Sequence, residues 1–236
     1  MNRIRKLLTV LLVGSVFVAG VCSCGRREQV HPDAGQTELP IIEETATPMP
    51  TEGIILVNSW KPISDSYAVD VRVLPNGQKV AAECYEDLTD MLADCAAEGM
   101  KPEVCSGFRT IAFQQELYED KVQRVMTEGH MREDAERIAA TEVARPGTSE
   151  HHTGLAVDII DKDYPVLDET QEQRPTQQWL MENSWKYGFV LRYPTGKTDV
   201  TGIIYEPWHY RYVGMETAKL MYEQDLCLEE YMERYG

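Results

Sequence analysis

The chain has 236 residues and a formal net charge of −16 at pH 7. This length allows one sizeable domain with an appendage. The negative charge argues against nucleic acid as a partner, because a phosphate backbone requires a basic surface. The charge is also unsuited to an anionic membrane face, so the body of the protein is expected to be soluble and self-repelling.

Residues 1–23 predict a signal peptide of the lipoprotein type. A basic start at residues 2–6 is followed by an apolar run at residues 7–21, with small residues toward its end. This order is typical of a secretory signal. The apolar run is short for a membrane span, which needs about 20 residues.

The segment VCSC, residues 21–24, resembles a bacterial lipobox with Cys24 as the acylated residue. Cys22 is a weaker candidate, since valine is a poor residue before a cleavage site, and a plain signal peptide with two incidental cysteines is the alternative. Residues 24–52 are rich in Pro, Thr and Glu and predict a flexible acidic tether. We therefore expect an extracytoplasmic protein, either secreted or anchored to the bacterial cell membrane.

Residues 53–236 predict one folded domain. Apolar runs and alternation indicate strands at 54–57, 69–74, 103–108, 155–160, 189–192 and 202–205. Helical periodicity and glycine stops indicate helices at 80–98, 111–127, 131–143, 176–187, 215–224 and 228–234. The turn 75–77, the polar loop 161–174 and the connection 194–200 separate these elements. Short strands and hairpin-length links predict an α+β fold, with a small, mainly antiparallel sheet flanked by helices.

Two details of the helices are open to a direct check. In the helix at 111–127 we expect Phe113 and Leu117 to face inward, with Tyr118 as a further candidate. In the helix at 80–98, Cys84 and Cys95 would lie about 16 Å apart along the axis, too far for a disulfide, which needs Cα atoms within about 7 Å. Any bridge would therefore join this helix to Cys105 or Cys227, and buried free thiols are the equal alternative.

The segment SEHHTGLAVD, residues 149–158, carries the first metal-ligand pattern. A turn at Gly154 can bring Asp158 back beside His151, and a charged aspartate on a half-buried strand must be paired or bind metal. Imidazole and carboxylate are the donors that zinc prefers. His152 cannot easily share the direction of its neighbour and is assigned to the wall of the site, with a plain surface histidine as the alternative.

The segment YEPWHY, residues 205–210, supplies the second pattern. In a regular strand Glu206 and His209 would point to opposite faces, but Pro207 breaks the ladder and a bend could turn both inward. His209 would then complete a set of two histidines and one aspartate, which leaves a fourth zinc position for water, as in catalytic sites. Glu206 is the natural general base for that water, and a surface ion pair with Arg211 is the alternative.

The segment SGFR, residues 106–109, ends a predicted strand with a cation. Arg109 could stabilise the oxyanion that forms when water attacks a carbonyl, whereas a solvent-facing strand end is the alternative. Gln114, one turn into the next helix, and Ser149 are candidates for hydrogen bonds to the terminal carboxylate of a substrate.

Taken together, SGFRT, S-x-H-x-x-G-x-A-x-D at 149–158 and E-P-W-H at 206–209 resemble the VanY-type D-alanyl-D-alanine carboxypeptidases. The resemblance covers residues 56–214 and extends to VanX dipeptidases, LD-carboxypeptidases and the hedgehog-like fold. It implies Zn²⁺ held by His151, Asp158 and His209, with Glu206 as catalytic base and Arg109 beside the carbonyl. Residues 53–236 would then form a zinc carboxypeptidase domain that removes the terminal D-alanine from the peptidoglycan stem peptide. The protein is expected to be a monomer.

Several alternatives remain open at the level of the sequence. The enzyme could instead be an LD-carboxypeptidase acting on tetrapeptide stems, for which Gln114 and Ser149 would again bind the substrate terminus. It could also be an endopeptidase that cuts inside the stem, a non-catalytic zinc-binding wall module, or a cell-wall adhesion protein. The intact Glu206 argues against a silent module.

Overall fold

The computed structural model describes residues 53–236. The expected signal peptide, the lipidation site at Cys24 and the tether at residues 24–52 lie outside the described residues. Within the described part no helix combines the length and the apolar character that crossing a membrane requires.

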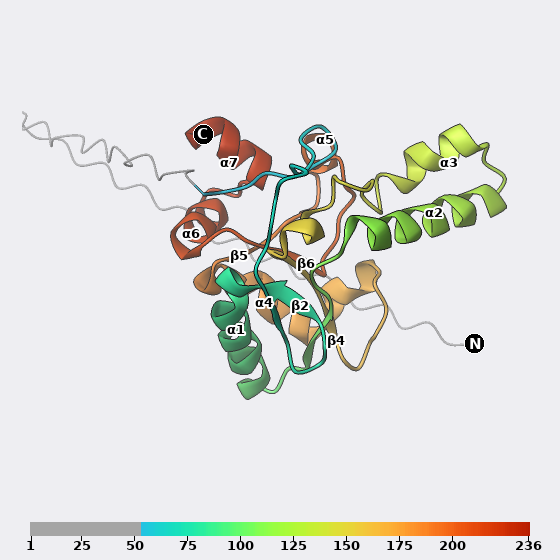
Figure 1. Cartoon of the computed structure of the whole chain (residues 1–236). Coiled ribbons are helices and arrows are strands. Elements are labelled where there is room, and N and C mark those ends of the chain that lie inside the picture. Colours follow the sequence, from blue (N-terminus) through green and yellow to red (C-terminus); the bar gives the residue numbers. More distant parts are fainter. Residues whose placement is uncertain (1–52) are drawn as a thin grey trace, which may run out of the picture. The chain divides into compact units, whose positions relative to one another are not determined.

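The centre of the domain is a four-stranded antiparallel sheet with the strand order β3-β4-β6-β5. A separate two-stranded hairpin, β1-β2, lies beside it, as seen in Figure 1. The strands are β1 Val71–Val73, β2 Lys79–Ala81, β3 Pro102–Ser106, β4 Ala156–Asp161, β5 Phe189–Leu191 and β6 His209–Tyr212. The predicted α+β class with a small antiparallel sheet is confirmed.

Seven α-helices and four 3-10 helices of the described chain surround these strands. The α-helices are α1 Tyr85–Ala97, α2 Ile111–Thr127, α3 Arg132–Ala139, α4 Pro175–Asn183, α5 Thr198–Thr201, α6 Met215–Glu223 and α7 Leu228–Tyr235. The 3-10 helices are η1 Ala82–Cys84, η2 Glu150–Thr153, η3 Glu169–Gln173 and η4 Ser184–Tyr187.

The main core lies on one face of the sheet, where α1 and α4 pack against β3 and β4. Leu88 and Met91 of α1 and Leu180 of α4 are fully buried there, against Val157 and Ile159 of β4. Because side chains alternate along a strand, this arrangement turns Asp158 to the opposite face. The core therefore sets the direction of a charged residue that belongs to the functional site.

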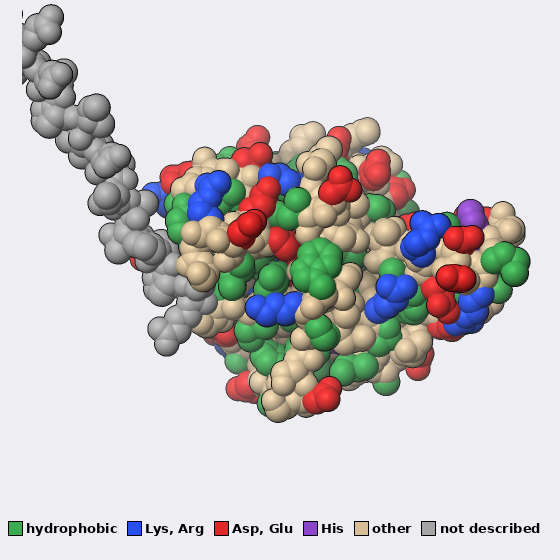
Figure 2. Space-filling view, turned by 90° about the horizontal axis from the view of Figure 1, so that it is seen from above, with side chains coloured by type: hydrophobic (Ala, Val, Ile, Leu, Met, Phe, Trp, Pro, Cys, Tyr) green, Lys and Arg blue, Asp and Glu red, His purple; other side chains and the backbone are tan. Residues whose placement is uncertain are grey.

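Helices α2 and α3 pack on each other and form a hairpin that projects from the body (Figure 1). Helix α2 matches the predicted range, and the Thr110 hydroxyl caps it by accepting from the Phe113 N–H at 3.2 Å. The projection at the right of Figure 2 carries acidic and basic side chains close together, in agreement with ion pairs such as Arg132–Glu119 at 2.7 Å and Arg137–Asp134 at 2.9 Å.

Some expected elements differ from the structure. Residues 54–57 are not a strand, because the Ile55 carbonyl accepts from the Arg211 side chain at 2.6 Å and its neighbours pack on the α6–α7 cluster. Residues 202–205 are not a strand either, since the Ile204 N–H donates to the Thr141 carbonyl at 2.9 Å instead. The helix expected from residue 80 begins at Tyr85, because β2 pairs with β1 before it.

Other differences concern the limits of helices and the direction of side chains. Phe113 is 48% exposed, because the buried face of α2 is set by its packing on α3 and consists of Gln114, Tyr118, Val122 and Val125. The expected helix at 131–143 is α3 alone, the loop at 161–174 contains η3, the helix at 176–187 is divided into α4 and η4, and the connection at 194–200 leads into α5.

The free-thiol alternative describes the cysteines of residues 53–236, since all four are free. Cys84, Cys95 and Cys227 are buried and Cys105 is partly buried. Burial raises the pKa of the Cys84 thiol to about 12, so this side chain behaves as a small apolar group at neutral pH.

Candidate metal centre

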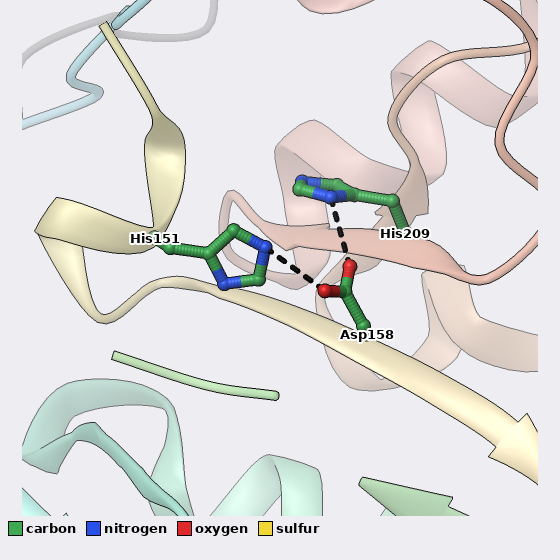
Figure 3. Close-up of side chains that lie close together, drawn as sticks. All are labelled: His151, Asp158 and His209. Carbon is green, nitrogen blue, oxygen red and sulfur yellow. Dashed lines mark ion pairs between the residues drawn. The ribbon is translucent and has the colours of Figure 1, made fainter. Parts of the chain in front are cut away.

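His151, Asp158 and His209 meet on the face of the sheet opposite the main core. The donor atoms of these three side chains lie within 4.8 Å of one another, and all three residues are buried. His151 comes from η2, Asp158 from β4 and His209 from the start of β6, and Figure 3 shows both imidazoles directed at the carboxylate. The structure thus brings together the two segments in which the sequence placed ligands.

The strand register explains why Asp158 and His209 are neighbours. They are direct partners in the β4–β6 pair, next to the pair Val157–Tyr210, whose side chains enter the core. His209 Nδ1 lies 3.1 Å from Asp158 Oδ1. Cross-strand partners share one face, so the apolar pair on one side of the sheet fixes the polar pair on the other.

His151 reaches the same point from a tight turn. The turn ends at Gly154 with φ 72°, where an added Cβ would come within 2.9 Å of the Ala81 backbone nitrogen. His151 Nδ1 lies 2.7 Å from the Gly107 carbonyl oxygen, so this nitrogen donates and Nε2 is left to face Asp158 Oδ2 at 3.3 Å. The turn and the carbonyl together aim one ring nitrogen at the carboxylate.

Glu206 enters the site through a bend, as the Pro207 signal predicts. The His209 N–H donates to the Glu206 carbonyl at 3.2 Å, and the turn brings Glu206 Oε2 to 3.6 Å from His209 Nδ1. Glu206 is 7% exposed, which excludes the surface ion pair with Arg211. Burial raises the pKa of the Glu206 carboxyl to about 8. Its carboxylate is therefore more basic than an ordinary glutamate, as a general base requires.

The pKa values of the other three groups show that the site favours positive charge between them. Burial lowers the pKa of His151 to about 4. Burial alone would raise the pKa of Asp158, but His151 and Arg109 outweigh it and hold the value well below its usual range. Burial alone would lower the pKa of His209, but the Asp158 and Glu150 carboxylates raise it to about 9. The site contains an ionised aspartate and a neutral imidazole at pH 7, and it favours positive charge at the second ring.

Arg109 lies at the edge of this group. It forms an ion pair with Asp158 Oδ2, and its Nε donates to Ser106 Oγ at 2.8 Å. Gln114 is buried, and its amide oxygen accepts from Arg109 Nη1 at 3.4 Å while its amide nitrogen donates to the Ala144 carbonyl at 2.8 Å. Both ends of Gln114 are therefore held within the protein, and the residue supports the guanidinium of Arg109.

One cavity of about 350 Å³ joins these groups. Its wall includes Arg109, Gln114, Ser149 and Glu206 together with the three candidate ligands. Helix α2 and the residues after α3 form another part of the wall, and Leu167 lies at the loop before η3. Apart from His152, every candidate site residue singled out in the sequence therefore opens on a single space of the size that small ligands occupy.

The residues fit a zinc ion. Asp158 Oδ1 is buried and has no hydrogen-bond partner within the described chain, although it faces His209 Nδ1. An orphaned buried carboxylate oxygen is costly unless a cation completes it. Two imidazoles and one carboxylate form a donor set that zinc accepts in catalytic sites, with a further position open.

Comparison with known proteins identifies the family. Residues 77–215 match the family described as VanY, D-alanyl-D-alanine carboxypeptidase. The chain belongs to the VanY family. This result confirms the resemblance that the three sequence motifs carry.

Relatives of the VanY family are similar over most of the described part. A D-alanyl-D-alanine carboxypeptidase of Enterococcus faecalis (strain ATCC 700802 / V583) is 44% identical over 180 residues, which are 76% of this chain and 65% of that protein. This chain thus spans slightly less than two thirds of the length of that relative.

Two solved structures of VanY proteins resemble this one. A mutant of the vancomycin resistance D,D-pentapeptidase VanY from a VanB-type cassette, in complex with Zn(II), is 44% identical with a TM-score of 0.70, and the match covers 75% of this chain and 97% of that one. VanYB in complex with D-alanine-D-alanine is 43% identical with a TM-score of 0.72, covering 77% and 98%.

Some residues of the site were not singled out in the sequence. The Tyr193 ring centroid lies 4.8 Å from that of His209, and the residue lines the cavity. Glu150 is fully enclosed behind His209, with its Oε2 at 3.6 Å from His209 Nε2. A charged residue directly between Ser149 and His151 is a signal that could have revealed Glu150, whereas nothing local marks Tyr193.

His152 belongs to the support of the site. It is 5% exposed, so the surface alternative is wrong. Its Nε2 accepts from the Gly147 N–H at 3.1 Å, and its Nδ1 donates to the Arg109 carbonyl at 2.8 Å. His152 thereby fixes the backbone that carries Arg109.

Proposed function

We propose that this protein is a zinc-dependent D-alanyl-D-alanine carboxypeptidase that removes the C-terminal D-alanine from peptidoglycan stem peptides. The observation that carries the proposal is the buried Glu206 beside the three clustered ligands His151, Asp158 and His209, in one cavity with Arg109. Membership of the VanY family, together with relatives solved with Zn(II) and with D-alanine-D-alanine, supports this choice of metal and substrate.

The ligand set would hold the ion through His151 Nε2, His209 Nδ1 and the Asp158 carboxylate, since these atoms face one another. Zinc in such a site supplies a Lewis acid that polarises a carbonyl and makes water more acidic. The carbonyl of Gly107 orients His151 for this role by accepting from its Nδ1.

Glu206 would move the proton. Its carboxylate takes a proton from the attacking water as the C–O bond forms at the scissile carbonyl. The protonated Glu206 then passes this proton to the amine of the leaving D-alanine as the C–N bond breaks. Enclosure of Glu206 supports both steps, because a carboxyl with a raised pKa can accept and release a proton near neutral pH.

Arg109 would stabilise the negative oxygen that builds up on the carbonyl, since a guanidinium aimed at a developing charge in an enclosed site is strongly favourable. Gln114 would hold this guanidinium in place through the hydrogen bond at 3.4 Å. Ser149 lines the same cavity and is proposed to bind the terminal carboxylate of the substrate.

Digestion of defined muropeptides tests the proposal. Purified protein should contain about one zinc per chain and release free D-alanine from a pentapeptide stem. Release of D-alanine from tetrapeptide stems alone would establish the LD-carboxypeptidase alternative, and release of an internal fragment would establish an endopeptidase. Zinc without any product would indicate a silent wall module, and a protein free of metal would overturn the assignment altogether.

We further propose that the protein acts outside the cytoplasm as a monomer, held at the bacterial membrane by a lipid on Cys24. The lipobox-like segment and the acidic tether support this location, because the substrate lies in the wall just outside the membrane. Replacing Cys24→Ala should release the full-length protein from the membrane fraction. An unchanged distribution would contradict lipidation at this residue.

A further inference from the structure

A buried cluster of charges lies on the side of His209 that faces away from Asp158. We call it the outer charge cluster, and it consists of Glu150, Arg192, Arg211 and Glu229. The side chains of Glu150, Arg192 and Arg211 have 0–1% of their surface exposed, and that of Glu229 has 9%. Burying charged side chains costs free energy unless each one is paired. Stability alone therefore does not explain why these four residues are buried together.

The two oxygens of Glu150 have different surroundings. Oε1 accepts from Arg192 Nε and from Arg211 Nη1, each at 2.8 Å. Oε2 is buried and has no hydrogen-bond partner within the described chain. It lies 3.6 Å from His209 Nε2, another buried atom without a partner in residues 53–236. These two buried atoms without a partner therefore face each other.

Both guanidinium groups are themselves held in place. Arg192 also donates to both oxygens of Glu229, at 2.8 and 2.6 Å. Arg211 donates to the carbonyls of Ile55 at 2.6 Å and of Tyr212 at 3.0 Å. Two guanidinium groups therefore hold Glu150 Oε1 in place, and a carboxylate paired in this way presents Oε2 as an acceptor.

His151 provides an internal comparison. Its Nδ1 faces the Gly107 carbonyl at 2.7 Å, another group that only accepts, and its Nε2 is thereby left for the metal centre. His209 is turned the other way, with Nδ1 toward Asp158 and Nε2 toward Glu150. Each imidazole thus has one nitrogen in the ligand group and the other against an acceptor.

We propose that Glu150 is a positioning residue: its Oε2, 3.6 Å from His209 Nε2, is the acceptor toward which Nε2–H is directed, and it so fixes the tautomer and the ring orientation that present Nδ1 to the metal. The inference rests on the proposed zinc function. It also assigns a role to the outer charge cluster, which holds this carboxylate in place and prevents it from turning away from His209. Partners of this kind, next to metal-bound imidazoles, affect metal affinity by about 10- to 100-fold.

The first test compares Glu150→Gln with Glu229→Gln, a matched control that removes a charge from the same cluster without touching His209. The dissociation constant for Zn(II) is measured by competition with a chromogenic chelator, and the unfolding of each metal-free variant is measured in urea. Glu150→Gln should weaken Zn(II) binding about 10- to 100-fold. Glu229→Gln should lower stability but change the Zn(II) constant by less than about threefold.

Two outcomes of this comparison would overturn the inference. One is a Glu150→Gln variant that binds Zn(II) as tightly as the original protein. The other is an equal loss of affinity in both variants, since that result would show only a structural role of the cluster. A wild-type protein that binds no Zn(II) would instead refute the proposed function, so the two failures are distinguishable.

A second measurement needs no variant and remains decisive if Glu150→Gln does not fold. Long-range ¹H–¹⁵N spectra of the Zn(II)-loaded wild-type protein report which nitrogen of each imidazole carries a proton. His151 should carry it on Nδ1, and His209 should carry a slowly exchanging proton on Nε2. A rapidly exchanging Nε2 proton on His209, or a proton on its Nδ1, would contradict the contact with Glu150.

Discussion

At the scale of single residues, the site separates two buried carboxyl groups by their surroundings. Asp158 lies against His151 and Arg109, which outweigh the effect of burial and hold its pKa well below the usual range. Around Glu206 the neighbouring His209 and Arg109 do not outweigh the effect of burial, and burial raises the pKa of Glu206 to about 8. Two carboxyl groups pushed apart in this way take different tasks, one as a permanent anion and the other as a proton carrier.

Replacing Glu206→Gln should therefore abolish proton transfer and leave the ligands intact. We expect kcat to fall about 10²- to 10⁴-fold, the contribution of a general base, with an unchanged zinc content. Glu142→Gln is the matched comparison, because Glu142 lines the same cavity but forms an ion pair with Lys121. Its effect should be much smaller, and equal losses in the two variants would contradict the role of Glu206.

Arg109→Lys tests the guanidinium at the same scale. Lysine keeps the positive charge near Asp158 but cannot reproduce the fork that also reaches Ser106 and Gln114. If Arg109 stabilises the oxyanion, kcat should fall about 10²- to 10³-fold, whereas KM should change little. A rise in KM at unchanged kcat would show instead that Arg109 binds the substrate carboxylate.

At the scale of elements, the site depends on two tight turns placed directly before the strands β4 and β6. The first contains His151 and closes at Gly154, where Ala81 N–H donates to the Gly154 carbonyl at 2.8 Å. The second runs from Glu206 to His209. In each case the strand carries one ligand, Asp158 or His209, and the turn before it carries a second group of the site, His151 or Glu206.

Gly154→Ala should damage the first turn in two ways. A left-handed backbone costs an alanine about 1–2 kcal/mol, and the new Cβ would also meet the Ala81 nitrogen at 2.9 Å. Gly196→Ala is the control, because Gly196 has φ +79° but nothing within 4 Å of the added Cβ. Urea unfolding should show the larger loss for Gly154→Ala, together with weaker zinc binding. Equal losses would show that the contact with β2 is unimportant.

At the scale of the whole molecule, the C-terminal helix α7 supports a site that lies far from it in the sequence. Leu228 and Tyr231 of α7 are fully buried in the cluster with α6. Glu229, between them, pairs with Arg192. The described chain after the family match at residue 215 is thus part of the packing behind the metal centre.

Truncation after residue 226 should therefore destabilise the domain by at least about 3 kcal/mol, because it exposes the partners of Leu228 and Tyr231 and leaves Arg192 with one fewer carboxylate. Arg234→Ala, on the exposed face of the same helix, should change stability by less than about 0.5 kcal/mol. Urea unfolding measures both, and a truncated protein of unchanged stability would contradict this role of α7.

Zinc should stabilise the whole domain, since its three ligands come from η2, β4 and β6. At a free zinc concentration of 100 times the dissociation constant, binding adds about 2.7 kcal/mol to the free energy of unfolding. Removing the metal with a chelator should accordingly lower Tm by about 5–10 °C. Calorimetry with added Mg²⁺ in place of zinc is the control, and an unchanged Tm on chelation would contradict a metal that bridges these elements.

Local chemistry in the sequence determined a large part of this protein. The helix at 111–127 was predicted with its observed limits from its periodicity and the closing Gly129, and in the structure the Thr110 hydroxyl caps its start. The candidate ligands and Glu206 were recognisable because zinc needs few donor types and because Pro207 signals a bend. The class of the fold followed from the periods of short apolar segments.

Tertiary structure decided the pairings. Asp158 stands opposite His209 because of the β4–β6 register, and the sequence contains no local signal for a contact between segments so far apart. The same holds for Glu150, whose place behind His209 depends on Arg192 and Arg211 from two other segments. Local patterns report backbone preference and burial, whereas register and ring orientation result from long-range packing of the complete core.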